Sequence, residues 1–196
     1  HESRLPEQAC SSLALDAHGQ LLLGYADGRL RRMDATRIET FDAGHGLSVG
    51  PITAMLHHQD LLLVAGEAGL AARIGNGHFV PVRTDMAGVL EGITGMVADA
   101  NGHLWLNGSR GLVRMESGLL RRALRSGLPV TPRLFDAIDG MPGIALQSGP
   151  IATAALADDG LLWLATNQGL AWLDTTRSHV NKMVPSVRIG EVLYGS

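Results

Sequence analysis

One serine in the sequence has neighbours of the kind that nucleophilic catalysis uses. Gly46–Gly50 reads Gly-Leu-Ser-Val-Gly, which matches the Gly-x-Ser-x-Gly pattern of a nucleophile elbow. That motif works on a turn between a strand and a helix, where the turn lifts the serine over an oxyanion hole. Here Pro51 and a β-type run follow instead of a helix. We therefore expect a turn between repeats at this point and no catalytic residue.

Histidines and aspartates supply further candidate ligands for a metal ion. His57-His58 with His45 offers nitrogen donors, but adjacent side chains of a strand point to opposite faces and chelate one ion poorly. The segments Asp99–Gly102 and Asp158–Gly160 resemble the start of a calcium-binding loop. Neither is followed by the glutamate that serves as the bidentate ligand in a full loop. The sequence thus predicts core or exposed histidines, hairpin turns, no metal site and no cofactor.

The composition excludes several classes of protein. The chain has 196 residues, 45% of them hydrophobic and 18% charged, with a net charge of −3, so nothing indicates binding to nucleic acid. A single cysteine, Cys10, cannot form an internal disulfide. No run approaches about 18 apolar residues, and the polar start is unlike a signal peptide. We expect contact with a membrane only through segments outside this chain.

The elements that carry these residues repeat along the chain. Gly19, Asp60, Gly102 and Gly160 each precede a Leu-rich triplet, and a second glycine follows nine residues after each of them. The intervals are 41, 42 and 58 residues, and the first two match the period of a β-propeller blade, about 40–50 residues. The third interval has about sixteen extra residues, which we assign to an inserted loop at about residues 125–147, in a connection between blades.

Each repeat reads as short strands rather than helices. The apolar runs are four to six residues long and end at Gly-containing turns such as Asp27-Gly28 and Asn101-Gly102, which favour hairpins. The runs do not alternate, which indicates strands covered on both faces, as in stacked blades. Trp105 and Trp163 occupy equivalent repeat positions and are predicted to be core anchors between blades. The prediction is an all-β fold, a propeller fragment of about four tandem four-stranded blades.

The repeat resembles a known family. Asp99–Leu112, with its Asp-x-x-Gly-x-Leu-Trp-Leu pattern and later Gly-Leu, is similar to the two-component regulator propeller repeat, and the resemblance covers most of Ser11–Asp174. Val184–Ile189 resembles the lead-in to the β-sandwich domain that follows such propellers. The expected organisation is a partial propeller over residues 1–183, formed by C-terminal blades, and the start of a linker or β-sandwich over residues 184–196.

The resemblance implies a sensory function. Propellers of this family form the extracytoplasmic sensor region of bacterial membrane receptors, whose outputs are histidine kinases, hybrid two-component regulators or diguanylate cyclases, and many respond to carbohydrate fragments. We therefore expect a periplasmic sensory module that is not itself an enzyme and that binds a carbohydrate or a partner. Binding residues are sought on the least repeat-like segment, because loops on rigid scaffolds carry function. The candidates are Arg133, Asp136 and Asp139, with Trp172 as a surface aromatic residue.

Two other functions stay open. Family propellers have about seven blades, so four would leave open blade edges, which invite pairing with another chain. A structural or oligomerisation module without a ligand, self-associating through these edges, is the first alternative. The second is a propeller-fold lyase resembling the streptogramin-inactivating type, which needs a histidine and a metal-binding carboxylate together. His103 and Glu116 are the candidates, with no obvious common face in the sequence.

Overall fold

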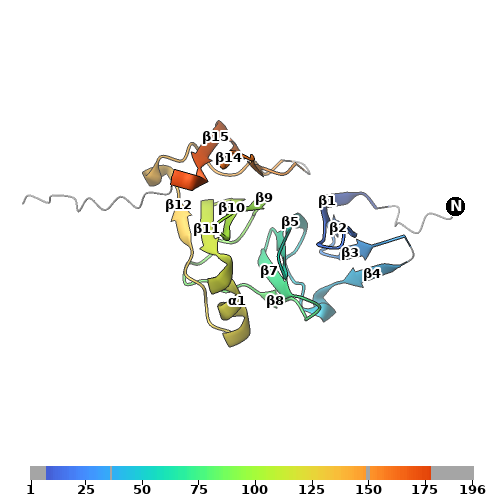
Figure 1. The fold of residues 1–196 in the computed structure, drawn as a ribbon. Helices are drawn as coiled ribbons and strands as arrows, with labels where there is room; N and C mark the ends of the chain where they lie inside the picture. The colour runs from blue at the N-terminus through green and yellow to red at the C-terminus, as the bar shows by residue number, and fades with distance from the viewer. Residues whose placement is uncertain (1–7, 36, 149–150, 178–196) are drawn as a thin grey trace, which may run out of the picture.

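Four antiparallel β-sheets follow one another along the chain (Figure 1). The structure is a computed structural model, and it describes residues 8–35, 37–148 and 151–177. Blade 1 consists of β1 (Cys10–Leu15), β2 (Leu21–Tyr25), β3 (Leu30–Met33) and β4 (Ile38–Phe41). Blade 2 consists of β5 (Ile52–His58), β6 (Leu61–Gly66), β7 (Gly69–Ile74) and β8 (Val80–Pro81). Blade 3 consists of β9 (Gly95–Ala98), β10 (His103–Gly108), β11 (Gly111–Glu116) and β12 (Arg133–Phe135). Blade 4 consists of β13 (Ala154–Leu156), β14 (Leu161–Thr166) and β15 (Gly169–Asp174).

The predicted all-β fold with about four blades is confirmed. Strands in each sheet lie in chain order, as a meander of hairpins produces, and three sheets have four strands. The fourth sheet has three strands within the part of the chain that the structure describes. The first strand of each blade lies beside the first strand of the next, β1 by β5, β5 by β9 and β9 by β13. This is the arrangement of propeller blades around an axis.

Each central blade is covered on both faces, as the non-alternating apolar runs predicted. All six residues of β6 are buried. Leu61 and Leu63 belong to the core between blades 2 and 3, whereas Leu62 and Val64 belong to the core between blades 1 and 2. Because successive side chains of a strand point to opposite faces, one Leu-rich strand fills two cores.

Hydroxyl groups join the innermost strands. The hydroxyl of Ser11 donates to the carbonyl oxygen of Ile52 over 2.7 Å. The hydroxyl of Thr53 donates to the carbonyl oxygen of Ile93 over 2.5 Å. Each bond runs from one blade to the next, about one repeat further along the chain. These bonds fix the offset between neighbouring blades and satisfy polar groups where the strands approach most closely.

The two ends of the array expose apolar side chains. On blade 1, Leu13 and Leu15 are more than half exposed. On blade 4, Trp163 is 41% and Trp172 is 63% exposed. The prediction that Trp163 is a core anchor is therefore wrong for this structure, because no blade within the described residues packs on that face. Trp105 occupies the equivalent position in blade 3, is covered by blade 4 and is 1% exposed, as predicted.

The extra residues of the third interval form a helix before they form a loop. Residues 117–126 fold as α1 (Ser117–Ser126), between β11 and β12, so the added length lies inside blade 3. Leu120 is fully buried in the core between blades 2 and 3, and Arg121 donates to the Asp60 carboxylate over 2.7 Å. Residues 125–147 accordingly contain the end of this helix, β12 and a 3₁₀ turn rather than a single inserted loop.

The remaining boundaries lie partly outside the structure. Residues 184–196, expected to begin a linker or a β-sandwich, lie outside the described residues. Within the described ranges, no helix has the length and apolar character needed to cross a membrane.

Candidate functional site

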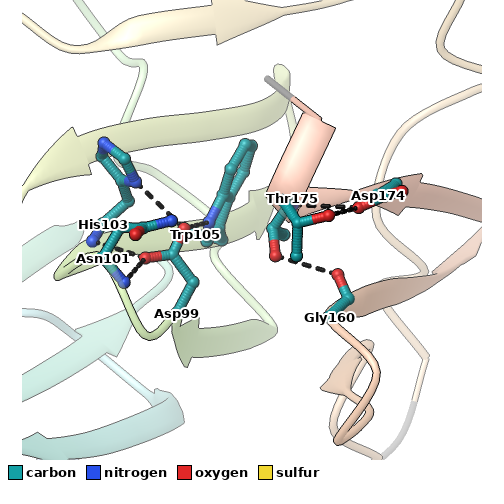
Figure 2. Close-up of polar contacts among 8 residues, drawn as sticks. Asp99, Asn101, His103, Trp105, Gly160, Asp174 and Thr175 are labelled. Carbon is teal, nitrogen blue, oxygen red and sulfur yellow. Dashed lines mark hydrogen bonds and ion pairs between the residues drawn. The ribbon is translucent and has the colours of Figure 1, made fainter.

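The best copy of the repeat motif forms a buried polar network around Asp99 (Figure 2). The Asp99 carboxylate accepts hydrogen bonds from the backbone N–H groups of Asn101 and His103, each over 2.9 Å. It also accepts from the indole Nε1–H of Trp105 over 2.9 Å and lies 3.0 Å from Nδ1 of His103. Asp99 is 4% exposed. One carboxylate therefore closes the β9–β10 turn and fixes the Trp105 ring that fills the core between blades 3 and 4.

Two opposing effects act on the ionisation of Asp99. Burial by itself would raise the pKa of this carboxyl. The hydrogen bonds from Trp105 and His103 favour the charged form, and they hold the pKa below its usual value. The carboxylate therefore stays ionised and accepts hydrogen bonds from its neighbours. This arrangement stabilises a turn and gives no sign of acid–base chemistry.

The equivalent turn of blade 4 is closed without the aspartate. Ala157 stands where the motif has Asp99, and within the turn the Asp159 carboxylate accepts only from the Leu161 N–H, over 3.0 Å. Instead the hydroxyl of Thr175 donates to the Gly160 carbonyl over 2.9 Å, as Figure 2 shows. The backbone N–H of Thr175 donates to the same carbonyl over 3.0 Å. The Ser117 N–H makes the corresponding backbone bond to the Gly102 carbonyl in blade 3, over 2.9 Å, so the hydroxyl bond of Thr175 is what blade 4 adds.

The predicted site residues Asp136 and Asp139 lie in the connector between blades 3 and 4. Asp136 precedes the 3₁₀ turn η2 (Ala137–Asp139) and accepts a hydrogen bond from the N–H of Ile138 over 2.8 Å. The Asp136 N–H in turn donates to the Asp139 carboxylate over 3.3 Å. This is a reciprocal capping box.

The connector between blades 1 and 2 is built in the same way. Asp42 caps the 3₁₀ turn η1 (Ala43–His45), and the ring of His45 lies 2.8 Å from the Asp42 carboxylate. Gly46 ends the turn with a φ of 82°, as Gly140 does with 89°. Asp136 and Asp139 are therefore repeated parts of a connector, in which an oxygen of each carboxylate accepts a hydrogen bond from the backbone.

The third predicted residue, Arg133, lies exposed on the edge strand β12. Its guanidinium carbon lies 4.4 Å from the ring centroid of Phe135. Phe135 stacks on Trp105 at 5.9 Å, and Arg114 lies over the Trp105 ring at 5.6 Å. Arg133 is thus the last member of a row of stacked arginine and aromatic side chains, which covers the outer side of the core between blades 3 and 4.

A cavity opens beside the same connector. It has a volume of about 320 Å³ and lies between the β10–β11 turn of blade 3, the connector and the β14–β15 turn of blade 4. We call it the rim cavity. Its walls are formed by Arg110, Asp136, Ala137, Ile138, Met141, Gly143, Ile144 and Gln168. Polar groups for hydrogen bonding and apolar side chains for packing meet there, as in sites for small ligands.

The structure brings only part of the predicted set together. Asp136 lines the rim cavity, whereas Arg133 and Asp139 are not among its lining residues. Trp172 lies opposite Trp163 in β15, on the face of blade 4 that points away from blade 3. The thickness of blade 4 therefore separates Trp172 from the other three residues.

Two residues of the rim cavity escaped the sequence reasoning. Arg110 and Gln168 each come immediately before the second glycine of their repeat, Gly111 and Gly169. A hairpin turn presents this position at the rim of a blade. Comparing polar residues at this one repeat position would have found both.

The Gly-x-Ser-x-Gly motif, which suggested a catalytic serine, has a structural role. The Gly46–Gly50 segment joins η1 to β5, Leu47 and Val49 are buried in the core between blades 1 and 2, and no helix follows. Among the described residues, no group of three or more His, Cys, Asp and Glu side chains is placed to hold a metal ion.

The histidine and glutamate of the lyase alternative lie closer than expected. His103 and Glu116 are direct partners across β10 and β11, so they share one face of the sheet, contrary to the sequence reading. The His103 ring is turned to Asp99, however, and Glu116 sits exposed at the start of α1. The pair forms no converging acid–base site.

The comparisons with known proteins support the fold. No family model matches the chain, and no curated protein matches it. Among solved structures, it is similar to the extracellular domain assigned to a hybrid two-component system of B. thetaiotaomicron, with 18% identity and a TM-score of 0.68 over 89% of this chain and 23% of that one. An extracellular domain assigned to a one-component system of the same organism gives 15% identity and a TM-score of 0.68, over 85% of this chain and 24% of that one.

A lyase also shares the architecture. The streptogramin B lyase structure gives 14% identity and a TM-score of 0.59, covering 87% of this chain and 56% of that one. The chain thus spans about a quarter of the length of the two extracellular domains and somewhat more than half of the lyase. At these identities, the likenesses establish that the chain folds as consecutive blades of a β-propeller.

Proposed function

We propose that this chain is a sensory propeller module of a bacterial signal-transduction receptor that works outside the cytoplasm, on the periplasmic side of the inner membrane. The observation that carries the proposal is the blade array itself, which superposes on extracellular domains assigned to two-component and one-component systems better than on the lyase. The module has no catalytic role of its own. Its output is a histidine kinase, a hybrid regulator or a diguanylate cyclase joined to it in the same receptor.

The rim cavity is the proposed ligand site. It lies where the connector and two hairpin turns from different blades meet, so a bound molecule would contact blades 3 and 4 together. The guanidinium of Arg110, the carboxylate of Asp136 and the amide of Gln168 suit the hydroxyl groups of a neutral saccharide, and Met141 and Ile144 suit its apolar face. Binding across two blades gives a direct way to change their relative position.

Replacement of Arg110 tests this site. We expect a neutral oligosaccharide from a screened panel to raise the melting temperature of the chain, and Arg110→Ala to weaken its binding about tenfold, as loss of a charged hydrogen-bond donor does. Arg29→Ala is the matched control, because Arg29 is an exposed turn arginine of blade 1. Calorimetric titration measures both. Binding that survives Arg110→Ala unchanged would exclude the rim cavity, and a panel without binders would count against a carbohydrate sensor.

The reading frame around this segment tests the receptor role separately. Further repeats upstream, with a membrane helix and a kinase or cyclase downstream, would support the proposal. A frame that encodes a free-standing secreted protein would contradict it.

Self-association is a second candidate function, and the exposed end faces favour it. Trp163 and Trp172 lie side by side on one end of the array, while Leu13 and Leu15 lie on the other. Blade 4 thus presents the kind of face on which a blade packs, and blade 1 presents the kind of face that packs on it. A second copy of this chain would cover both.

Charged substitutions on blade 4 test self-association. We expect light scattering to give a mass that rises with concentration for the unchanged chain, and a monomer mass for the double variant Trp163→Glu, Trp172→Glu. Leu128→Glu is the control, because Leu128 is an exposed apolar residue on neither end face. If the unchanged chain is a monomer at all concentrations, self-association is excluded as a function.

A further inference from the structure

A buried arginine lies between blades 1 and 2, and the described residues offer it no ion pair and no hydrogen-bond partner for its Nε. Arg73 belongs to β7 and is directly opposite Leu62, whose side chain packs toward blade 1, so Arg73 points into the same interface. Its side chain reaches two aromatic rings, with the guanidinium carbon 4.7 Å from the centroid of Phe41 and 5.2 Å from that of Phe79. Arg73 is only 6% exposed.

The surroundings leave part of the hydrogen-bonding capacity of Arg73 unused. Its Nε is inaccessible and has no hydrogen-bond partner, and no ion pair to Arg73 occurs among the described residues. Aromatic faces attract a cation but accept none of the five N–H groups that lie in the guanidinium plane. Burying a charge is costly unless it is paired. Burial also lowers the pKa of Arg73, which reports the same cost.

The neighbouring charges do not provide the missing partner. Glu39 is the nearest candidate, but its carboxylate forms an ion pair with Arg32 across β3 and β4. That pair balances its own two charges. Asp16 also attracts the guanidinium electrostatically, but neither carboxylate forms an ion pair with Arg73.

A cavity of about 250 Å³ lies against Arg73. Arg32 and Glu39 line one side, and the exposed β7–β8 turn at residues 76–78 lines the mouth. The rings of His45 and His78 and the amide of Asn76 add polar groups to the wall. The space is well above the roughly 30 Å³ that one water molecule takes in liquid. It has the size and the polarity for a small organic anion.

We propose that this cavity is a binding site for a small carboxylate, such as a sugar acid, with Arg73 as its charged partner. A carboxylate matches the single positive charge, and its two oxygens match the planar donors of a guanidinium. The polar groups at the mouth, Asn76 and His78, would bind the hydroxyl groups of the same molecule. The site is separate from the rim cavity, which lies between blades 3 and 4, and it does not rest on the sensory role.

Titration of the whole chain with D-glucuronate tests the proposal, with D-glucose as the uncharged comparison and inorganic phosphate as a different anion. We expect glucuronate to bind and to raise the melting temperature, and glucose and phosphate to bind at least about tenfold more weakly. Arg73→Met keeps much of the apolar length of the side chain and should weaken glucuronate binding at least about tenfold. Arg31→Met is the matched control, because Arg31 also lies over an aromatic ring, that of Tyr25, but does not line the cavity.

A second variant guards against a change in folding at Arg73. Asn76→Ala with His78→Ala removes two exposed turn side chains at the mouth, so it should weaken glucuronate binding while leaving the melting temperature of the free chain unchanged. No binding of glucuronate at millimolar concentration would overturn the proposal. Binding that Arg73→Met leaves intact would overturn it as well, and equal binding of phosphate would overturn the assignment to a carboxylate.

Discussion

Replacement of Trp105 by alanine is expected to lower the free energy of unfolding by about 3–5 kcal/mol. Trp105 is 1% exposed and lies in the core between blades 3 and 4, where it packs with Leu112, Leu162 and Leu164. Its removal takes away a large buried ring and leaves a cavity that rigid sheets cannot close. Chemical denaturation of the two chains, followed by circular dichroism, measures the difference.

The chain contains its own control for this experiment. Trp163 holds the same repeat position in blade 4 but is 41% exposed, because its face points away from blade 3. We expect Trp163→Ala to cost less than about 1 kcal/mol, as substitutions on an open surface do. Equal losses for the two variants would show that the end face of blade 4 is covered in solution, and would contradict the assignment of Trp105 as the one core anchor of the pair.

Removal of the Asp99 carboxylate is expected to cost about 2–4 kcal/mol. Asp99→Ala leaves the buried indole N–H of Trp105 without an acceptor, at about 1–3 kcal/mol, and removes the cap of the β9–β10 turn, at about 1 kcal/mol. Asp16→Ala is the matched control, because Asp16 closes the equivalent turn of blade 1 through the N–H groups of His18 and Gln20 but has no indole partner. We expect about 1 kcal/mol there. A smaller loss at Asp99 than at Asp16 would exclude the network as a source of stability.

The same carboxylate gives the stability a dependence on pH. The pKa of Asp99 is lower in the folded chain than the value of about 3.9 in an unfolded one, so the folded state binds fewer protons near that pH. Its contribution is therefore fully present above about pH 4 and is lost as the pH falls through the folded-state pKa. Urea denaturation between about pH 2 and pH 6 should show a shallower acid loss for Asp99→Asn than for the unchanged chain. Identical slopes would contradict the assignment.

Much of the fold could be predicted from local patterns. The glycine spacing located the hairpins, and the residues Asn101-Gly102 and Asp159-Gly160 do form turns, with φ values of 80° and 85° at the glycines. The helix α1 was missed although its sequence is amphipathic, because its ten residues lie within a repeat otherwise built of short strands. Its fully buried side chain, Leu120, packs against a core built by blades 2 and 3.

The candidate sites were harder to predict than the blades. Asp136 and Asp139 stand out in the sequence because they interrupt the repeat, yet they cap a connector turn as Asp42 and His45 do. Arg73 looks like any arginine on the outer part of a strand, and its burial depends on Phe41 of blade 1 and Phe79 beyond the next turn. Such sites come from residues brought together by the packing of blades.

The sequence by itself determined the repeat, the succession of strands and turns within it and the number of blades. Hairpin geometry and side-chain alternation are local properties of a few residues. The tertiary structure alone decided which face of each blade is covered. Trp105 and Trp163 hold equivalent positions in similar strands, but only Trp105 has another blade packed on it. Burial is a property of what lies across the interface, and that neighbour is specified elsewhere in the chain.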